Sequence, residues 1–347
     1  MLKLSAGHTT MIGSMPQNDP NDAFASFEKY PLSLPTWPQF PKISFKEAMI
    51  PQYSEGFPGI KVDEIEKKIW VEKDDNLVNN ITDFFEKSVA GDLDAFAISD
   101  NYACGFSLFI EYMKQKNQKL SHIKGQLTGP FTFGLGLNDQ DSKAVWFDEM
   151  YREVVINGIK MKALWQANQL KQVADNVVLF FDEPVLSALG TPAYISIQDE
   201  DVINIFNEII TPLHEQDIAV GVHCCGNMDW GLLAKTDLDI IAFDAYFFGD
   251  KVALYPQELS NFLDQGGYLA WGIVPTSEAE LLHKINVDNL KQKRNDLFSL
   301  FSQKGMNENR IKSQILYTPS CGMGSGSLTS QESEIILKLL SELQDHQ

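Results

Sequence analysis

Short apolar runs alternate with longer helix-like stretches along almost the whole chain, and this alternation limits the possible folds more than any other feature. The runs are rich in Val, Ile and Phe and have the length of buried strands. They lie at residues 9–14, 95–100, 123–128, 177–182, 219–224, 240–244, 268–273 and 315–318. Helical spacing of apolar residues, with charged residues between them, occurs at 63–90, 144–174, 201–215, 277–301 and 331–343.

Strands that alternate with helices form parallel βαβ units. The eight strand-like runs predict an α/β fold of the TIM (β/α)8 barrel type. The length of 347 residues suits a single domain of this type over 1–347. Residues 34–40 are a candidate for a further strand. Residues 30–59 contain six prolines among aromatic residues, which excludes regular helix there. We expect an irregular insertion after the first strand, either packed on the barrel rim or forming a lid or substrate wall.

The charge and composition exclude several classes of partner. The formal net charge is -19, which argues against nucleic acid and anionic membranes. The chain has only three arginines, Arg152, Arg294 and Arg310, so a polyanionic substrate is disfavoured. No stretch resembles a signal peptide or is apolar enough to span a bilayer. Four unevenly spaced cysteines do not form a disulfide framework, and we expect a reducing cytoplasmic location.

Soft metal ligands are concentrated in two segments, each at the end of a predicted strand. His223 and Cys225 end one strand, and Cys321 follows another. Imidazole and thiolate together favour Zn²⁺. The ligands come from separate strand ends rather than from paired knuckles, which favours a catalytic site over a structural one. Cys224 lies between His223 and Cys225, so its side chain should point to the opposite face of the strand, as a buried thiol. Asp244, at the end of the next strand, is either a fourth, harder ligand or a hydrogen-bonded carboxylate.

Two other strand ends carry polar residues. Asp182 and Glu183 follow an apolar run and precede a proline. Such an acid pair can bind a substrate ammonium group or cap a helix. Near the N-terminus, Gly13 allows close backbone approach and Ser14 offers N–H and hydroxyl donors. Each of these motifs, like the sequence at 125–130, is weak evidence for a binding site when taken alone.

Taken together, these segments resemble the catalytic half of the cobalamin-independent methionine synthase family. The matching segments follow the family's order and lie at 9–17, 127–130, 182–186, 223–225, 244 and 319–322. The resemblance implies a stand-alone zinc-dependent methyltransferase, with His223, Cys225, Cys321 and Asp244 as metal ligands. It further implies that Asp182 binds the amino group of homocysteine and that Ile12, Gly13 and Ser14 lie against its carboxylate.

The chain departs from the family pattern at several positions. The family's acidic ligand is usually glutamate, whereas this chain has Asp244. The family's second amino-binding acid has its best match in Asp100, and Glu55 is the alternative. The family's D-x-H-S at the seventh strand end is absent, because residues 271–276 contain no histidine.

The missing histidine bears on the methyl donor. Methyltetrahydrofolate leaves as an amine that needs a proton, which a histidine would supply, whereas a methyl-corrinoid leaves as a stable anion. We therefore expect a corrinoid protein as donor. The alternatives are methyltetrahydrofolate as donor, another thiol such as coenzyme M as acceptor, a uroporphyrinogen decarboxylase-like barrel, and a non-catalytic zinc-binding or corrinoid-docking subunit.

Overall fold

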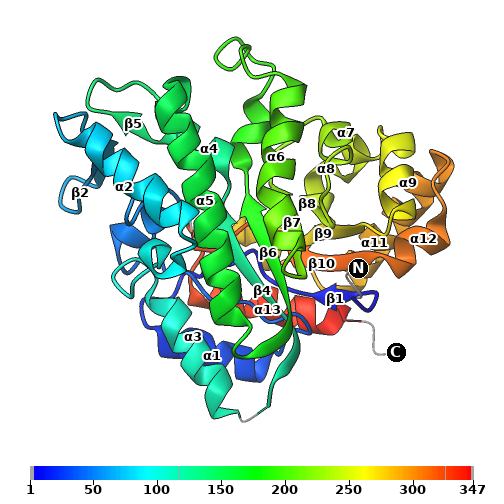
Figure 1. Cartoon of the computed structure of the whole chain (residues 1–347). Coiled ribbons are helices and arrows are strands. Elements are labelled where there is room, and N and C mark those ends of the chain that lie inside the picture. The colour runs from blue at the N-terminus through cyan, green and yellow to red at the C-terminus, as the bar shows by residue number, and fades with distance from the viewer. Residues whose placement is uncertain (1–3, 117, 325, 345–347) are drawn as a thin grey trace.

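A curled parallel sheet forms the centre of the computed structural model, which describes residues 4–116, 118–324 and 326–344 (Figure 1). Within these residues the sheet has seven strands in the order β1-β10-β9-β8-β7-β6-β4, all parallel. Their bounds are β1 His8–Thr9, β4 Leu120–Thr128, β6 Ala174–Asp182, β7 Ile218–Cys224, β8 Ile240–Phe243, β9 Tyr268–Val274 and β10 Ile315–Pro319. The fold class is therefore α/β with a barrel-like sheet.

Helices cover the convex face of this sheet. Their bounds are α1 Pro20–Lys29, α2 Leu77–Val89, α3 Cys104–Gln115, α4 Pro130–Gly136, α5 Glu149–Leu170, α6 Asp199–His214, α7 Trp230–Leu233, α8 Ala245–Val252, α9 Pro256–Asp264, α10 Ala279–Leu282, α11 Val287–Gln303, α12 Glu308–Ser313 and α13 Ser330–Leu343. Short 3-10 helices are η1 Phe45–Glu47, η2 Pro51–Tyr53, η3 Leu93–Phe96, η4 Val145–Phe147 and η5 Pro184–Ala188. Side-chain caps begin several helices; Asp148 accepts the Tyr151 N–H at the start of α5, for example.

The predicted closed barrel of eight regular strands is not what the described residues form. The irregular segment 34–39 lies between the two outermost strands of the sheet instead. Leu34 donates its N–H to the Thr9 carbonyl, and Lys124 donates its N–H to the Pro35 carbonyl. An isolated parallel bridge also joins Ser14 to Gln39. Part of the proline-rich region therefore links β1 to β4. Pro35 and Pro38 lack an N–H group and so prevent a continuous ladder, but their carbonyls and the N–H groups of the residues between them can still form single hydrogen bonds.

Three further expectations about the elements were wrong. Residues 95–100 form no strand; Asp92 caps η3 there by accepting the Ala95 N–H. The first strand ends at Thr9, and Gly13 beyond it has a φ of 151°, which is outside the ordinary extended range. The predicted helix over 63–90 is shortened to α2, because Ile60–Asp63 and Lys68–Val71 pair as the antiparallel strands β2 and β3.

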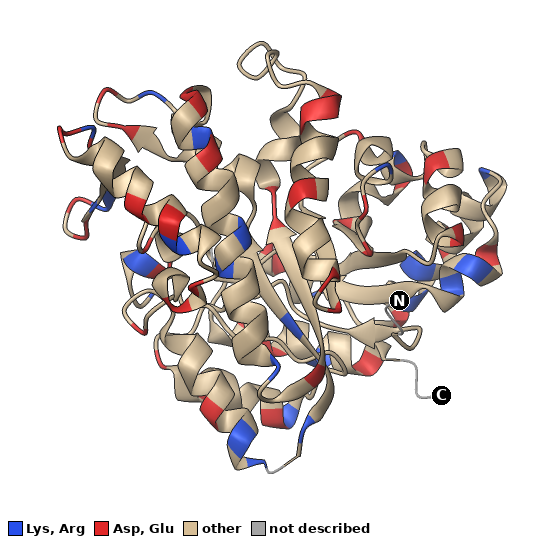
Figure 2. Ribbon diagram, in the orientation of Figure 1, with Lys and Arg blue, Asp and Glu red and all other residues tan. Residues whose placement is uncertain are grey.

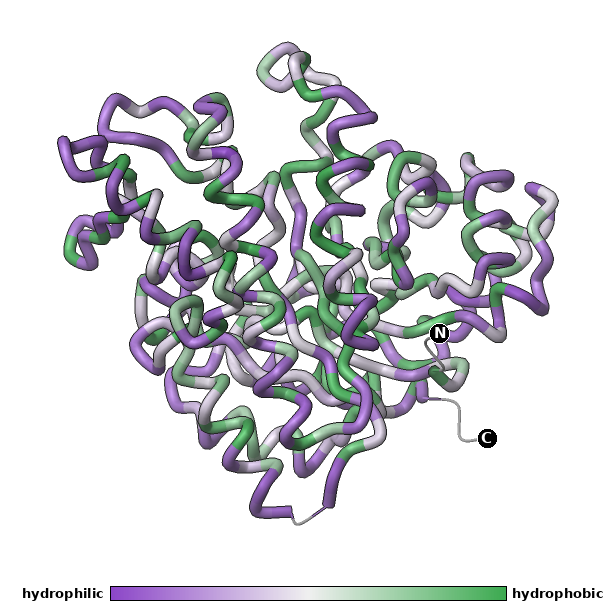
Figure 3. The backbone as a smooth tube through the Cα atoms, viewed as in Figure 1, coloured by the Kyte–Doolittle hydropathy of each residue, from purple (hydrophilic) through white to green (hydrophobic). Residues whose placement is uncertain are grey.

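Successive side chains of each strand point to opposite faces of the sheet, and this produces two separate apolar cores. On the convex face, Trp271 packs against Phe298 and Phe301 of α11. On the concave face a smaller cluster fills the interior of the curled sheet. It consists of Leu4, before the first strand, and of alternate strand residues: Val178, Phe180, Ala219, Ile240, Ala242, Tyr268, Ala270 and Leu316. Both faces are buried, as in parallel sheets generally, and Figure 3 shows the resulting hydrophobic colour along the central strands.

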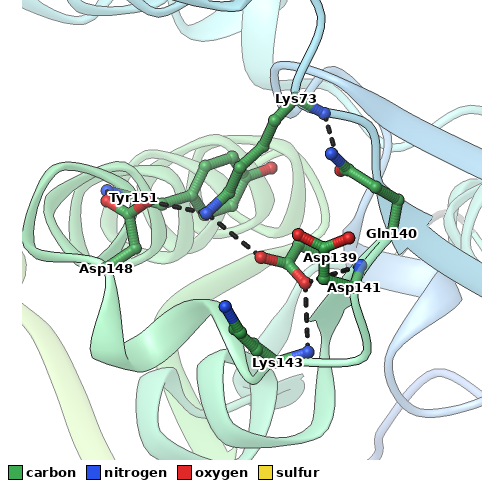
Figure 4. A network of polar contacts seen from close by, with 7 residues as sticks. All are labelled: Lys73, Asp139, Gln140, Asp141, Lys143, Asp148 and Tyr151. Carbon is green, nitrogen blue, oxygen red and sulfur yellow. Dashed lines mark hydrogen bonds and ion pairs between the residues drawn. The ribbon is translucent and has the colours of Figure 1, made fainter.

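A small second sheet, in the order β2-β3-β5, joins the region before α2 to β5, Asn138–Asp139. Lys73, two residues after the end of β3, pairs with Asp139 at 3.1 Å and with Asp148 at 2.8 Å (Figure 4). Asp139 also accepts the N–H groups of Asp141 and Lys143. These contacts connect the loop before α2 to β5 and to the start of α5, since Asp139 belongs to β5 and Asp148 caps α5.

Acidic residues outnumber basic ones, 47 to 28, and both kinds are spread over many elements (Figure 2). In the part of the chain that the structure describes, no helix has the length and hydropathy needed to cross a bilayer.

Candidate metal and substrate site

Three side chains from two strand ends meet at the carboxyl end of the sheet. The ligand atoms of His223, Cys225 and Cys321 all lie within 4.8 Å of one another, and among the described residues they form a group that can hold a metal ion. His223 shares the inward face with Ala219, four residues earlier in β7, which explains its direction. The sequence expectation that these three residues come together is therefore met in the structure.

The donor set fits a soft metal ion. His223 is 3% exposed, and neither of its ring nitrogens has a hydrogen-bond partner, which is costly for a buried imidazole unless a ligand completes it. The pKa of Cys225 is lowered to about 4 by the nearby Cys321 thiol and then by His223. The pKa of Cys321 is raised by the same proximity and by burial. A pair of thiols that already stabilises a thiolate beside an unpartnered imidazole suits Zn²⁺.

The remaining cysteine of the motif is separate from this group. Cys224 is fully buried in the outer core, and its Sγ donates only to the Gly226 carbonyl at 3.6 Å. Burial raises the pKa of its thiol to about 12, so it remains protonated and unreactive. The expectation of a buried packing role agrees with this position.

Asp244 lies close to the metal group but is not part of it. Its Oδ1 accepts the Phe247 N–H at 2.9 Å and so caps α8. Burial raises the pKa of this carboxyl to about 6, while His223 lowers it. The cap uses one carboxylate oxygen. Asp244 as a fourth ligand stays a prediction, and its capping contact explains why an acid is placed at this strand end in any case.

The two acids that end β6 have different environments. Asp182 lies beside His223 in the sheet register and faces inward, and its buried Oδ1 has no hydrogen-bond partner. Burial raises the pKa of Asp182 to about 6. Glu183 faces the opposite way and accepts the N–H groups of Phe131 and Thr132, so it caps α4. Glu183 therefore has a capping role, although toward α4 rather than toward the following helix, and ammonium binding by Asp182 stays a prediction.

The segment of Ile12, Gly13 and Ser14 forms another wall. Lys124, fully buried inside the sheet, donates from Nζ to the Ile12 carbonyl at 2.7 Å and lies over the Phe180 ring at 4.8 Å. Burial lowers the pKa of this lysine to about 7. Ser14 accepts the Gly324 N–H through its Oγ at 3.1 Å, which fixes the loop that carries Cys321. A fixed wall of this kind holds a ligand with little reorganisation.

Gly13→Ala is expected to be strongly destabilising. A Cβ on Gly13 would collide with the Gln39 Oε1 and would lie 2.6 Å from the Gln126 side chain, at a φ of 151° that non-glycine residues avoid. Overpacking and backbone strain together predict a loss of roughly 3–5 kcal/mol in unfolding free energy. Gly91→Ala is the matched control, because Gly91 has a φ of 69° but nothing within 4 Å. It should cost only about 1 kcal/mol. Equal losses in chemical denaturation would contradict the packing argument.

These walls enclose one cavity of about 350 Å³, within the size range of small-molecule sites. Ile12, Ser14, Asp182 and the three metal-group residues line it together with Gln39, Glu47, Met49, Thr128 and others. Asp100 is exposed and does not line the cavity. Glu55 is not a lining residue either; it accepts the N–H and hydroxyl of Ser99.

The second acid in the cavity is Glu47, which the sequence did not reveal. It is 3% exposed, accepts the N–H groups of Phe40 and Cys104, and has a pKa raised by burial. In the sequence, Ser44 precedes it by three residues, a spacing that is typical of a capping box. Its place among the residues that line the cavity shows that this acid belongs to the site.

No family model matches the sequence, and the search of curated proteins gave no match. Among solved structures, a methyltransferase from Methanosarcina mazei superposes with a TM-score of 0.56 over 98% of this chain and 95% of its own, at 11% identity. A protein from Listeria monocytogenes, described as a possible vitamin-B12-independent methionine synthase, gives a TM-score of 0.55 over 99% and 98% of the two chains, at 13% identity. At these identities the likeness concerns the fold: the chain has the fold of methyltransferase-like and methionine synthase-like proteins.

Proposed function

We propose that this protein is a zinc-dependent methyltransferase that transfers a methyl group to the thiol of L-homocysteine and so forms methionine. The observation that carries the proposal is that one cavity combines an imidazole–thiol metal group with two buried acids, Asp182 and Glu47. The metal group suits a substrate thiol, and the acids suit an ammonium group. The neighbours' fold and the motif order support the same assignment.

Each wall would bind one part of the substrate. Asp182 presents an unpartnered buried oxygen, and a charge-assisted hydrogen bond from the substrate ammonium would satisfy it. Glu47 adds a second negative charge on the same cavity. Ser14 and the backbone beside Gly13 offer the donors for the carboxylate. With both ends held, the substrate thiol is directed to His223, Cys225 and Cys321.

The chemistry needs a thiolate and an aligned methyl donor. A free thiol of this type has a pKa of roughly 8.5 and is mostly protonated at neutral pH. Zinc held by His223, Cys225 and Cys321 would supply the Lewis acidity that favours the thiolate. The substrate sulfur forms its bond to the methyl carbon as the bond between that carbon and the donor breaks, and the electron pair leaves with the donor. The chain's own contribution is to position both reactants.

We propose a corrinoid protein as the donor. Among the described residues that line the cavity, His223 is the only histidine, and it belongs to the metal group. Just after the end of β9, where the family pattern would have its D-x-H-S, Thr276 donates its N–H to the Ser320 Oγ at 3.1 Å. Neither group is acidic enough to protonate a departing amine, whereas a departing corrinoid needs no proton.

The test compares donors on the zinc-loaded protein with L-homocysteine as acceptor. We expect methionine to form with free methylcobalamin, used as a surrogate for the corrinoid protein, and not with 5-methyltetrahydrofolate. Turnover with the folate alone would overturn the donor assignment. Coenzyme M, which lacks an amino group, should be a poor acceptor because Asp182 would keep its unpaired buried oxygen; a preference for coenzyme M would overturn the choice of homocysteine.

A further inference from the structure

Gln39 lies in the wall of the cavity, although no sequence motif singled it out. It is 8% exposed, and its main chain is fixed on both sides: its N–H donates to the Gly13 carbonyl and its carbonyl accepts the Met15 N–H. Its side-chain Oε1 lies against the Cα of Gly13, since a Cβ there would collide with it. Gln39 is therefore held beside the segment that forms the amino acid end of the cavity.

A chain of hydrogen bonds determines which way the Gln39 amide faces. Gln52 donates from Nε2 to the Tyr102 carbonyl at 3.0 Å. Because a carbonyl can only accept, the NH2 group of Gln52 must face Tyr102, and its Oε1 must face Gln39. The Gln39 Nε2 accordingly donates to the Gln52 Oε1 at 2.5 Å. The first amide hydrogen is thus used.

The second hydrogen of the same amide is used in the same way. Tyr53 is fully buried and donates its hydroxyl to the Gln126 carbonyl at 2.8 Å. Its oxygen is left as an acceptor, and the Gln39 Nε2 donates to it at 3.0 Å. Two backbone carbonyls, those of Tyr102 and Gln126, therefore fix the orientation of the Gln39 amide. Among the described residues no donor reaches the Gln39 Oε1, so this side chain offers the cavity an acceptor only.

We infer that Gln39 is a specificity-determining residue whose Oε1 accepts a hydrogen bond from the substrate ammonium group, with Gln52 and Tyr53 as its positioning residues. The inference rests on the proposed function and deepens it. Asp182 and Glu47 line the same cavity as Gln39 and supply its charge. The neutral amide adds directionality, because an acceptor with a fixed orientation binds only a hydrogen-bond donor.

The experiment measures binding of two thiols to the zinc-loaded protein by calorimetry. L-homocysteine carries the amino group, and 4-mercaptobutanoate is the same molecule without it. In Gln39→Met the side chain keeps its approximate shape and loses the acceptor. We expect homocysteine affinity to fall about tenfold or more, as for a hydrogen bond to a charged group. Affinity for 4-mercaptobutanoate should stay within about twofold, because this ligand makes no such bond.

A second variant, Tyr53→Phe, retains Gln39 but removes one of the two acceptors that orient it. The freed amide can turn, so the preference for homocysteine over 4-mercaptobutanoate should fall several-fold. Zinc content and melting temperature of both variants report whether the fold is intact. Equal weakening of the two thiols, or an unchanged preference in whichever variant folds, would overturn the role of Gln39. A wild-type protein with no preference for homocysteine would instead overturn the proposed substrate.

Discussion

Cys321→Ser is expected to abolish zinc binding and methyl transfer together. Cys321 is the one metal-group residue contributed by the β10 end of the sheet, and its Sγ lies within 4.8 Å of the ligand atoms of His223 and Cys225. Serine keeps the shape but is a poor ligand for a soft metal at neutral pH. Loss of one of three protein ligands should weaken zinc binding by about a hundredfold or more, since even outer-shell changes cost roughly 10–100-fold. Metal analysis after dialysis against a chelator, together with a methionine-formation assay, measures both effects.

Cys224→Ala is the matched control for this prediction. Cys224 is adjacent in sequence to Cys225 but lies in the outer core, with only the Gly226 carbonyl as its polar partner. The variant should keep its zinc and its activity and lose about 1 kcal/mol of stability, because a small buried group is removed. A Cys321→Ser protein that remains active without zinc would show that the metal group has been assigned wrongly.

Asp182→Asn is expected to remove most of the affinity for homocysteine while leaving the metal in place. The amide is the same size as the carboxylate but carries no charge, and Asp182 is 7% exposed, so water cannot replace the lost interaction. Loss of a buried charge-assisted hydrogen bond should cost about 2–4 kcal/mol, or roughly 30–1,000-fold in the dissociation constant. Calorimetric titration with homocysteine gives the affinity, and metal analysis gives the zinc content.

The control acid lies in the same strand. Asp175 is exposed at the start of β6 and pairs with Lys119 at 3.0 Å, so Asp175→Asn should leave homocysteine binding unchanged. Binding of 4-mercaptobutanoate should be retained in Asp182→Asn, because that ligand has no ammonium to lose. If Asp182→Asn binds homocysteine as tightly as the wild type, the ammonium is held elsewhere; if it loses zinc, Asp182 supports the metal group instead.

The strand ends that form the site could be predicted from the sequence because buried parallel strands are continuous apolar runs. The runs before Asp182, His223 and Cys321 are of this kind, and parallel strands bring their carboxyl ends to one side of the sheet. The same reasoning failed at 95–100. The start of this run belongs to η3, which Asp92 caps, and Ser99 farther along bonds to Glu55 instead of pairing in a sheet. Local hydropathy does not distinguish these two cases.

The residues that the sequence did not reveal come from the proline-rich region. Glu47 and Gln39 obtain their positions from side-chain contacts with other elements: Glu47 accepts the N–H of Cys104 at the start of α3, and Gln39 donates to Tyr53 in η2. No periodicity marks such residues, because Gln39 lies in an irregular segment and Glu47 in a single short 3-10 turn, η1. Asp100 was chosen by its place after a predicted strand, and the absence of that strand removed the reason for the choice.

The segment 34–39 also has a consequence for how the protein avoids aggregation. An open parallel sheet leaves unpaired N–H and C=O groups along its outermost strands, and these are templates for pairing with other chains. Here Leu34 occupies the free side of β1, and the Pro35 carbonyl occupies that of β4. Gln39 belongs to the same segment, so a folding intermediate without this segment in place would have exposed strand edges and an incomplete cavity wall. Docking of the segment therefore covers the edges of the sheet and completes the cavity together.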